Sequence, residues 1–151
     1  MSFFVGARSQ RWLTLTPDDI RAGATLVGDF NPVHHDEAFA ATTRFGGLFA
    51  SGAHTSALLA GMVSQEWPRH RQGGDGRPAD ARRPRGYVGV DYAVEFRAPC
   101  MANRRLRFEW EVTAVEPKSR GEIIRLEGAI VDEDAGTLVL SARMTMFGYY
   151  E

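Results

Sequence analysis

The sequence contains a single cysteine, Cys100, so no disulfide can form within the chain. A lone cysteine suits a reducing compartment, and its commonest role is that of a small buried residue. No apolar run approaches the roughly 18 residues that a transmembrane helix needs. The first residues, MSFFVGARSQRW, lack the long apolar core and the cleavage site of a secretory signal. These absences favour a cytoplasmic protein.

The sequence also lacks an excess of either charge. Its 18 Lys and Arg residues against 19 Asp and Glu residues leave a formal net charge of −1, so nothing suggests binding to nucleic acid or to an anionic membrane. With 44% hydrophobic and 25% charged residues, the composition is that of a globular protein. The chain has 151 residues and no internal repeat, and we expect one domain over residues 1–151.

The first half of the chain carries helix signals. A short strand is expected over residues 11–16, and a helix should follow it. Thr16 can cap this helix, and Pro17 fits its first position. Asp18 and Asp19 suit its positive end. The helix should end near Gly28.

An irregular loop should follow over residues 29–35, because Pro32 disfavours helical geometry in the preceding residue. Asp36 can then cap a short helix over residues 37–42. A longer helix should run from about Ala53 to Trp67. Its residues are small or apolar almost all round, so it should be buried. Close packing against a sheet would explain Gly61, since glycine in a helix costs roughly 1 kcal/mol relative to alanine.

From Tyr87 onward the sequence alternates between apolar and polar residues, which is the pattern of half-buried strands. Turn residues in segments 99–103, 117–121 and 132–136 divide this half into four strands. We expect an antiparallel meander with one apolar face, wrapped around the apolar helix. This arrangement is an α+β hot-dog fold. The inward residues should be Val88, Val90, Tyr92, Val94, Phe96, Leu106, Phe108, Trp110, Val112, Ile124, Leu126, Gly128, Ile130, Leu138, Leu140, Ala142, Met144 and Met146.

Residues 68–86 differ in character from both halves and are longer than most ordered loops. Glycine and proline alternate there with six arginines: Arg69, Arg71, Arg77, Arg82, Arg83 and Arg85. Two interpretations stay open. The segment is either a solvated insertion without a role in binding, or a basic lid that contacts the phosphates of a ligand.

The segment from Asp29 to Glu37 is the richest in reactive side chains. A carboxylate at Asp29 and an imidazole at His34, both on an irregular loop, can converge on one water molecule. The carboxylate accepts a proton, and the imidazole orients the water or relays a proton. The alternative is purely local, with Asp29 capping a turn, His34 bonded to the backbone, and His35 and Asp36 at the surface.

A metal site is a third interpretation of this segment. However, His34, His35, Asp36 and Glu37 are consecutive, and adjacent side chains do not point to one centre. We therefore expect neither a metal ion nor a redox cofactor.

Gly52 stands at the expected start of the apolar helix. Its backbone N–H, and that of Ala53, would lie at the positive helix end, where they can bind an oxyanion or a polarised carbonyl. The alternative is a glycine that only the turn into the helix requires. His54 lies within the first turn, and a lone helical histidine is more often structural.

The run GDFNPVHHD at residues 28–36 closely resembles the Asp-x-Asn-Pro-x-His signature of R-specific enoyl-CoA hydratases, the MaoC-like family of hot-dog proteins. The continuation over residues 39–47 and the entry at Ser51-Gly52 are similar as well. The resemblance is specific over residues 16–63, and the strand-rich remainder agrees in architecture only. It implies reversible addition of water to a trans-2-enoyl thioester carried by coenzyme A or acyl-carrier protein, without a further cofactor.

The resemblance also implies roles for individual residues. Asp29 and His34 would hold the catalytic water, Asn31 would support the loop, and the Gly52 amide would polarise the thioester carbonyl. Family members often have histidine at the position of Ser51, and this departure leaves the acyl group open. The residues expected to contact substrate are Asn31, Ser51, Ala53 and His54.

A homodimer or larger homo-oligomer is expected, because a single curved sheet has edges to protect. The resemblance adds a ligand tunnel at the subunit interface. Two other functions stay open. A hot-dog acyl-CoA thioesterase usually has an acid on or near the central helix, and residues 53–65 contain none. A non-catalytic acyl-thioester-binding subunit would not need Asp29 and His34.

Overall fold

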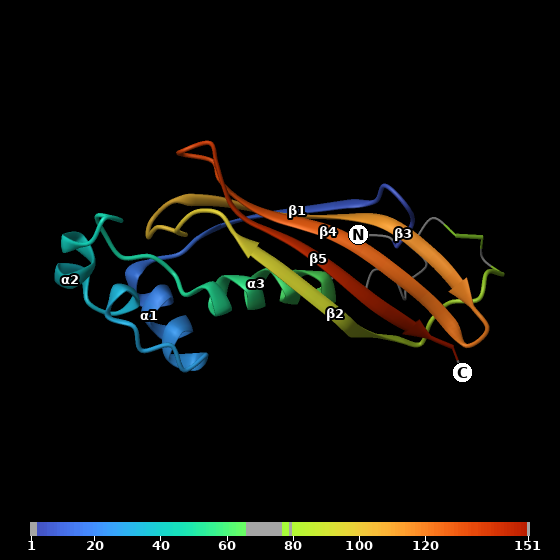
Figure 1. Ribbon diagram of the computed structural model, residues 1–151. Helices are drawn as coiled ribbons and strands as arrows, with labels where there is room; N and C mark the ends of the chain where they lie inside the picture. The colour runs from blue at the N-terminus through green and yellow to red at the C-terminus, as the bar shows by residue number, and fades with distance from the viewer. Residues whose placement is uncertain (1–2, 66–76, 79, 151) are drawn as a thin grey trace.

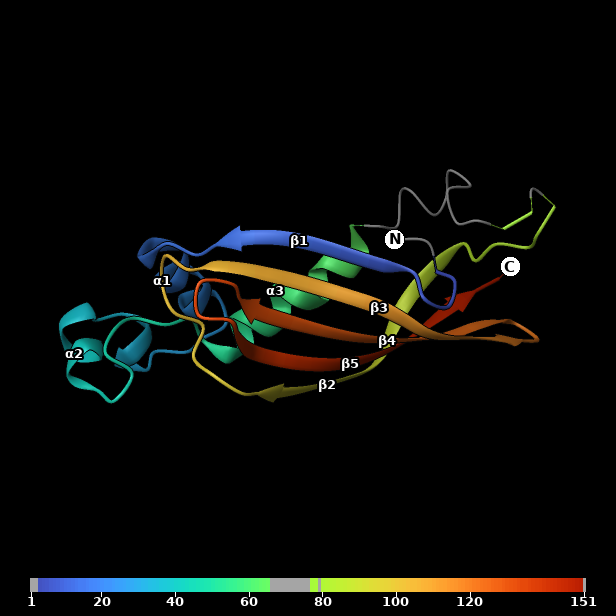
Figure 2. The ribbon, with the colours of Figure 1, turned by 90° about the horizontal axis from the view of Figure 1, so that it is seen from above.

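The computed structural model describes residues 3–65, 77–78 and 80–150 (Figure 1). Five strands form one antiparallel sheet in the order β1-β3-β4-β5-β2, and this sheet curves along one side of the central helix α3 (Figures 1 and 2). The predicted α+β hot-dog fold is confirmed. In chain order the elements are β1 (Arg8–Thr14), α1 (Pro17–Leu26), the 3₁₀ turn η1 (Pro32–His34), α2 (Glu37–Thr42), α3 (Gly52–Ser64), β2 (Gly86–Phe96), β3 (Arg105–Lys118), β4 (Gly121–Asp132) and β5 (Thr137–Tyr149).

The four C-terminal strands do not form the predicted simple meander. Strands β3, β4 and β5 are consecutive neighbours, but β2 pairs with β5 at one edge of the sheet. β2 cannot pair with β3, because β1 and β4 already occupy the two sides of β3. Residues 97–104 therefore connect the β2 edge with the interior of the sheet (Figure 2).

The predicted alternation is correct for the inner strands and fails in part at the edges. A register shift between Gly89 and Asp91 leaves an extra residue in β2, and such a bulge reverses which side chains face inward. Val88 and Val90 are consequently 51% and 61% exposed. A second register shift, in the pairing of β4 with β5, has a similar effect. It buries Val139 and exposes Leu138, which was expected to face inward. The fully buried residues of the inner strands include Leu106, Phe108, Trp110, Val112, Ile124, Leu126, Ile130 and Leu140.

The helix starts agree with the sequence. The Asp19 N–H donates to the Thr16 hydroxyl (3.2 Å), and the Thr16 N–H donates back to the Asp19 carboxylate (2.9 Å). This reciprocal pair is a capping box. At α2, Asp36 accepts a hydrogen bond from the Phe39 N–H (2.9 Å). Local capping thus sets where α1 and α2 begin.

Helix α3 is less buried than predicted, and Figure 1 shows the sheet along one of its sides. Ala53 and Ala57 are exposed. A side chain at Gly61 would meet nothing within 4 Å, so the expected close packing at this glycine is wrong. The predicted end at Trp67 lies outside the described residues. No helix of the described part is long and apolar enough to cross a membrane.

Two aromatic residues fix α3 to the sheet. Trp110 of β3 donates its indole N–H to the Leu59 carbonyl (2.7 Å). Tyr92 of β2 donates its hydroxyl to the Ser56 carbonyl (2.9 Å). These bonds satisfy polar groups that the apolar interior would otherwise leave unpaired, and they set the position of α3 over the sheet.

The described arginines of the 68–86 segment contact the protein itself. Arg77 donates to Glu122 (2.8 Å), a carboxylate that is only 2% exposed. Arg83 donates to the carbonyls of Ala81 and Pro78 (both 3.1 Å). A buried carboxylate needs such a partner. At least part of the arginine content therefore serves the fold, while residues 68–76 and 79 lie outside the described part.

Candidate active site

The loop after α1 brings Asp29 and His34 together. Gly28 adopts a left-handed conformation (φ 74°), which ends α1 and turns the chain. The Asp29 N–H then donates to the Ala24 carbonyl (2.9 Å). The Asn31 side chain caps η1 by accepting from the Val33 N–H (3.3 Å). This single turn directs the His34 side chain back toward Asp29.

The two side chains form a close and oriented pair. His34 Nε2 lies 3.2 Å from Asp29 Oδ2, and 34% of the Asp29 side chain is exposed. His34 is only 6% exposed, and its Nδ1 lies 2.8 Å from the Phe49 carbonyl. A carbonyl can only accept, so Nδ1 carries the hydrogen and Nε2 of the neutral ring is an acceptor. A water molecule beside the pair can therefore donate one hydrogen to each partner.

The surroundings of Asp29 favour its charged form. The nearby Ser51 hydroxyl makes the largest contribution to lowering the pKa of the Asp29 carboxyl below its ordinary value, and the Asn31 N–H adds to it. Desolvation opposes this change. The Ser51 Oγ lies near the carboxylate but does not meet hydrogen-bond geometry with any partner in the described chain. Asp29 is ionised near neutral pH and can accept a proton.

Replacing Ser51 by alanine should raise the pKa of Asp29 toward its ordinary value, because the variant removes the group that most favours the carboxylate. A carbon-13 NMR titration of the Asp29 carboxyl measures this shift. Ser56→Ala is the matched control, since the Ser56 hydroxyl donates to the Gly52 carbonyl (2.6 Å) within the same helix. An unchanged Asp29 titration in Ser51→Ala would refute this role of Ser51.

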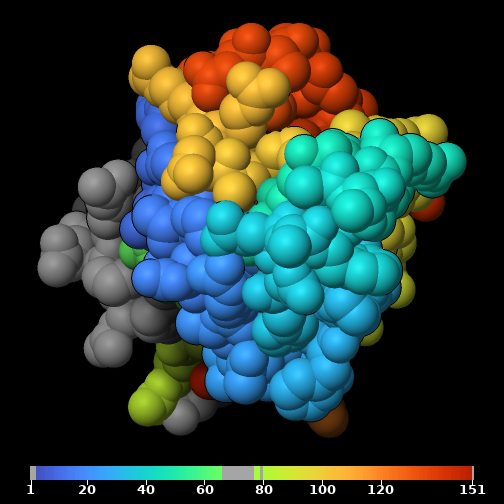
Figure 3. All heavy atoms as spheres, turned by 90° about the vertical axis from the view of Figure 1, so that its left-hand side faces the viewer, coloured from blue at the N-terminus to red at the C-terminus, as the bar shows by residue number. Residues whose placement is uncertain are grey.

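His34 lines a cavity of about 470 Å³ at the N-terminal end of α3. In Figure 3 the segment around α2 lies against the connection that follows β2, and residues of both segments line the cavity. Gly52 is the first residue of α3, so its N–H has no acceptor within the helix. A Cβ at Gly52 would lie 2.7 Å from the Phe96 ring. The main lining residues are His34, Arg44, Phe49, Gly52, Thr55, Phe96, Arg97, Cys100 and Val139.

Cys100 also lines this cavity but is not a nucleophile at neutral pH. Burial, with a smaller contribution from the negative charge of Asp132, raises the pKa of its thiol to about 12. Since the thiolate is the reactive form of cysteine, the protonated Cys100 does not support an acyl-enzyme mechanism.

The structure brings some of the predicted site residues together and separates others. Ser51 adjoins Asp29, and Gly52 shares a cavity with His34. Asn31 is exposed and caps η1, and Ala53 is also exposed. No group of three His, Cys, Asp or Glu side chains suited to a metal ion occurs among residues 3–65, 77–78 and 80–150.

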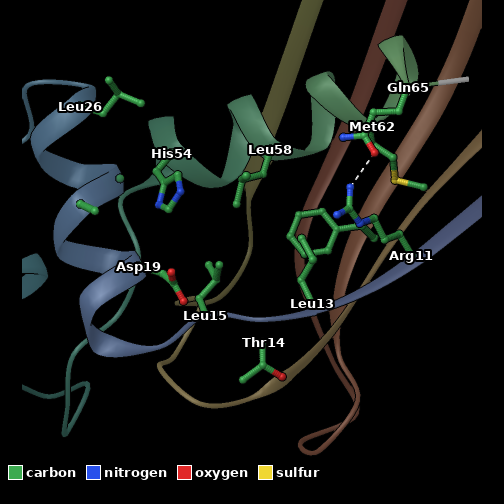
Figure 4. A pocket seen from close by; sticks show the side chains of 13 residues that line it. Arg11, Leu13, Thr14, Leu15, Asp19, Leu26, His54, Leu58, Met62 and Gln65 are labelled. Carbon is green, nitrogen blue, oxygen red and sulfur yellow. Dashed lines mark hydrogen bonds between the residues drawn. The ribbon is translucent and has the colours of Figure 1, made fainter. Parts of the chain in front are cut away.

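His54 lines a different cavity, of about 540 Å³, between β1, α1 and α3 (Figure 4). Its ring packs over Gly23, where a Cβ would lie only 2.0 Å from Nδ1. That nitrogen is buried and has no hydrogen-bond partner in the described chain. Burial lowers the pKa of the imidazole, and Asp19 opposes the shift. The structure thus does not bring His54 to the Asp29–His34 pair.

Sequence reasoning missed the function of His35 in the loop. Its Nε2 donates to the Asp29 carbonyl (2.8 Å), and its ring stacks on Phe30 with 5.9 Å between centroids. The Arg21 side chain donates to the His35 carbonyl (3.0 Å). The local alternative places His35 at the surface, whereas it is half-buried and holds the backbone that carries Asp29. The adjacent histidines were the only sequence signal.

Comparison with known families agrees with this geometry. The family model described as "MaoC like domain" matches residues 6–128, and the chain belongs to this family. The (R)-specific enoyl-CoA hydratase of Aeromonas caviae is 28% identical over 114 residues, which cover 76% of this chain and 74% of that protein. The 3-hydroxybutyryl-CoA dehydratase of Methylorubrum extorquens is 26% identical over 119 residues, which cover 79% of this chain and 66% of that protein.

Solved structures extend the likeness to the whole fold. The A. caviae (R)-hydratase involved in PHA biosynthesis matches with a TM-score of 0.72 and 26% identity, and 96% of each chain is covered. The R-hydratase PhaJ1 of Pseudomonas aeruginosa matches with a TM-score of 0.76 and 24% identity, covering 98% of this chain and 83% of that one. The family match and the relatives from A. caviae and M. extorquens support hydratase or dehydratase chemistry at the level of the family.

Proposed function

We propose that this protein is an R-specific enoyl-thioester hydratase, which adds water reversibly to a trans-2-enoyl thioester. The observation that carries the proposal is the Asp29–His34 pair, with 3.2 Å between its reactive atoms and the His34 tautomer fixed by the Phe49 carbonyl. The first residue of α3, Gly52, lines the cavity beside the pair. The hydratase and dehydratase relatives support the same chemistry.

In the proposed reaction Asp29 accepts a proton from the bound water, and the water oxygen forms a bond to C3 of the substrate. The C2–C3 π electrons move toward the thioester carbonyl, whose oxygen gains negative charge. The Gly52 N–H and the positive end of α3 stabilise that charge. The proton held by the Asp29–His34 pair then passes to C2, which completes the addition. General acid–base placement contributes about 10²–10⁴-fold, and an oxyanion donor about 10²–10³-fold.

Two exposed arginines of the cavity support a phosphate-bearing carrier, either coenzyme A or acyl-carrier protein. Within the described residues no carboxylate pairs with Arg44, whose guanidinium lies over the Phe45 ring at 4.8 Å. Arg97 pairs with Glu95, but an ion pair between exposed side chains contributes little. Arginine suits phosphate oxygens. We therefore assign carrier recognition to Arg44 and Arg97 in preference to the arginine-rich segment.

The two other functions have less support. Helix α3, from Gly52 to Ser64, contains no acid that could serve a thioesterase, and Cys100 stays protonated. A purely binding role would not require the close approach of His34 Nε2 to the Asp29 carboxylate.

A spectroscopic assay tests the proposal. Purified protein is mixed with trans-2-enoyl-CoA substrates while the conjugated absorbance and the free thiol are followed together. We expect the absorbance to fall without thiol release. Thiol release would instead support a thioesterase, and binding without any reaction would support a non-catalytic subunit. The corresponding pantetheine thioester, which lacks the nucleotide phosphates, should show a higher KM at similar kcat.

We further propose that two copies associate through β2. β2 is an edge strand, since β5 is its only partner among the strands of the described residues. It carries Val88, Val90 and Phe96, which are 51%, 61% and 59% exposed. Apolar side chains on an open edge favour pairing with another strand. The expected mass by light scattering is twice 16.7 kDa. Val88→Lys should lower that mass, whereas Leu138→Lys, at an exposed site on β5, should not. A monomeric wild type at micromolar concentration would refute the proposal.

A further inference from the structure

Another cavity, distinct from that of His54, lies farther along α3 from the active-site cavity, and we call it the second cavity. Its volume is about 490 Å³, close to the 470 Å³ of the first. Both cavities lie between α3, β2 and β5, since residues of all three elements line each of them. The second cavity is mainly apolar, and its lining residues include Phe3, Ala60, Val63, Tyr87, Met144 and Met146.

Tyr92 lies on β2 between residues that line the two cavities, although it lines neither cavity itself. Along β2, Phe96 lines the active-site cavity and Gly89 lines the second one, and Tyr92 lies between them. Along α3, Thr55 lines the first cavity and Ala60 the second, and Ser56 lies between them. The Tyr92 hydroxyl donates to the Ser56 carbonyl (2.9 Å). This contact therefore joins β2 to α3 between the residues that line the two cavities.

The Tyr92 side chain is held firmly at this position. Its ring packs against Trp110, with 6.3 Å between the ring centroids. Its β2 position pairs with Met144, a residue that lines the second cavity. Burial raises the pKa of Tyr92 to about 12, so the hydroxyl stays a hydrogen-bond donor at neutral pH. Packing and hydrogen bonding together keep the ring in place.

We propose that Tyr92 is a specificity-determining residue, which fills the space between the two cavities and thereby restricts the protein to short-chain acyl thioesters. The inference depends on the proposed function, because it takes the active-site cavity as the acyl-thioester site. The carrier lies toward the exposed Arg44 and Arg97, and the thioester carbonyl faces Gly52. Acyl carbons beyond C3 then extend along α3 toward Tyr92. Removing the ring would connect the active-site cavity with the apolar space around Ala60 and Val63.

The experiment compares the wild type with Tyr92→Val, which removes the ring and keeps a residue suited to a strand. Calorimetry measures the affinities for saturated butyryl-CoA and octanoyl-CoA, and the hydration assay measures kcat/KM for the matching enoyl thioesters. Each buried methylene contributes about fourfold to affinity. In Tyr92→Val the octanoyl-to-butyryl affinity ratio should therefore rise at least about tenfold, and the kcat/KM ratio should rise with it.

Two further variants keep the test decisive. Tyr92→Phe retains the ring but loses the bond to Ser56, and it should raise the octanoyl-to-butyryl ratio by a smaller factor, even if Tyr92→Val fails to fold. Tyr150→Phe is the matched control, because the Tyr150 hydroxyl contacts Glu122 (3.4 Å) outside both cavities, and its ratio should stay at the wild-type value.

The calorimetric affinities for saturated acyl-CoA ligands separate this inference from the proposed function. If the wild type hydrates no enoyl thioester but the Tyr92 variants still gain affinity for octanoyl-CoA, the hydratase proposal falls and the role of Tyr92 stands. If folded Tyr92 variants keep the wild-type affinity ratio, the role of Tyr92 is overturned, whatever the hydration assay shows. A wild type that already prefers octanoyl-CoA over butyryl-CoA would overturn it as well.

Discussion

Replacing Asp29 by asparagine should lower kcat/KM for enoyl-thioester hydration by about 10²–10⁴-fold. The amide is nearly the same size as the carboxylate but cannot accept the proton of the attacking water. Its oxygen can still accept from the Asn31 N–H, which lies 3.2 Å from Oδ1 in the wild type. We therefore expect the loop and the fold to persist.

The measurement is steady-state hydration kinetics, with thermal unfolding followed by circular dichroism as the control for folding. Asp36→Asn provides a matched carboxylate substitution on the same segment, at a residue that caps α2 and lies outside the pair. It should leave turnover close to wild type. A folded Asp29→Asn protein with wild-type turnover would show that Asp29 is not the base.

His34→Ala should have the second largest effect. We expect kcat/KM to fall by about 10²–10⁴-fold, because the acceptor nitrogen that orients the water is lost. The substitution also leaves the Phe49 carbonyl without its partner at 2.8 Å, so stability should fall by roughly 1–3 kcal/mol. Unfolding curves must therefore accompany the kinetics, and activity must be measured where the variant is folded.

His35→Ala is the informative comparison, because adjacent side chains diverge on the 3₁₀ turn. His35 binds the Asp29 carbonyl rather than the carboxylate, and the loss of one such hydrogen bond is expected to lower turnover by about tenfold or less. Losses of equal size at positions 34 and 35 would contradict the division between a residue that orients the water and one that positions the loop.

Features that depend on neighbouring residues could be predicted from the sequence. The start of α2 follows from Asp36, which caps the helix, and the start of α1 follows from Thr16 and Pro17. The closeness of Asp29 and His34 also depends on a short segment, in which Gly28 turns the chain and Asn31 caps η1. These motifs encode their own geometry, so the sequence allowed the pair to converge, with the purely local arrangement as the alternative.

Features that depend on distant partners could not be predicted in the same way. The edge position of β2 depends on β1 and β4 having occupied both sides of β3, and no residue of β2 encodes that competition. The bulge between Gly89 and Asp91 likewise appears only once β2 is paired with β5. The separate cavity of His54 depends on Gly23 of another helix. Each of these features is set by tertiary packing.

The most direct test of the account is the stereochemistry of hydration in deuterium oxide. If one Asp29–His34 pair both takes the proton from water and delivers it to C2, the product is the (3R)-hydroxyacyl thioester with one deuterium at C2, on the same face as the new hydroxyl. Chiral chromatography and proton NMR of the product measure both centres. A 3S product, a mixture at C3, or deuterium on the opposite face would contradict catalysis by this pair.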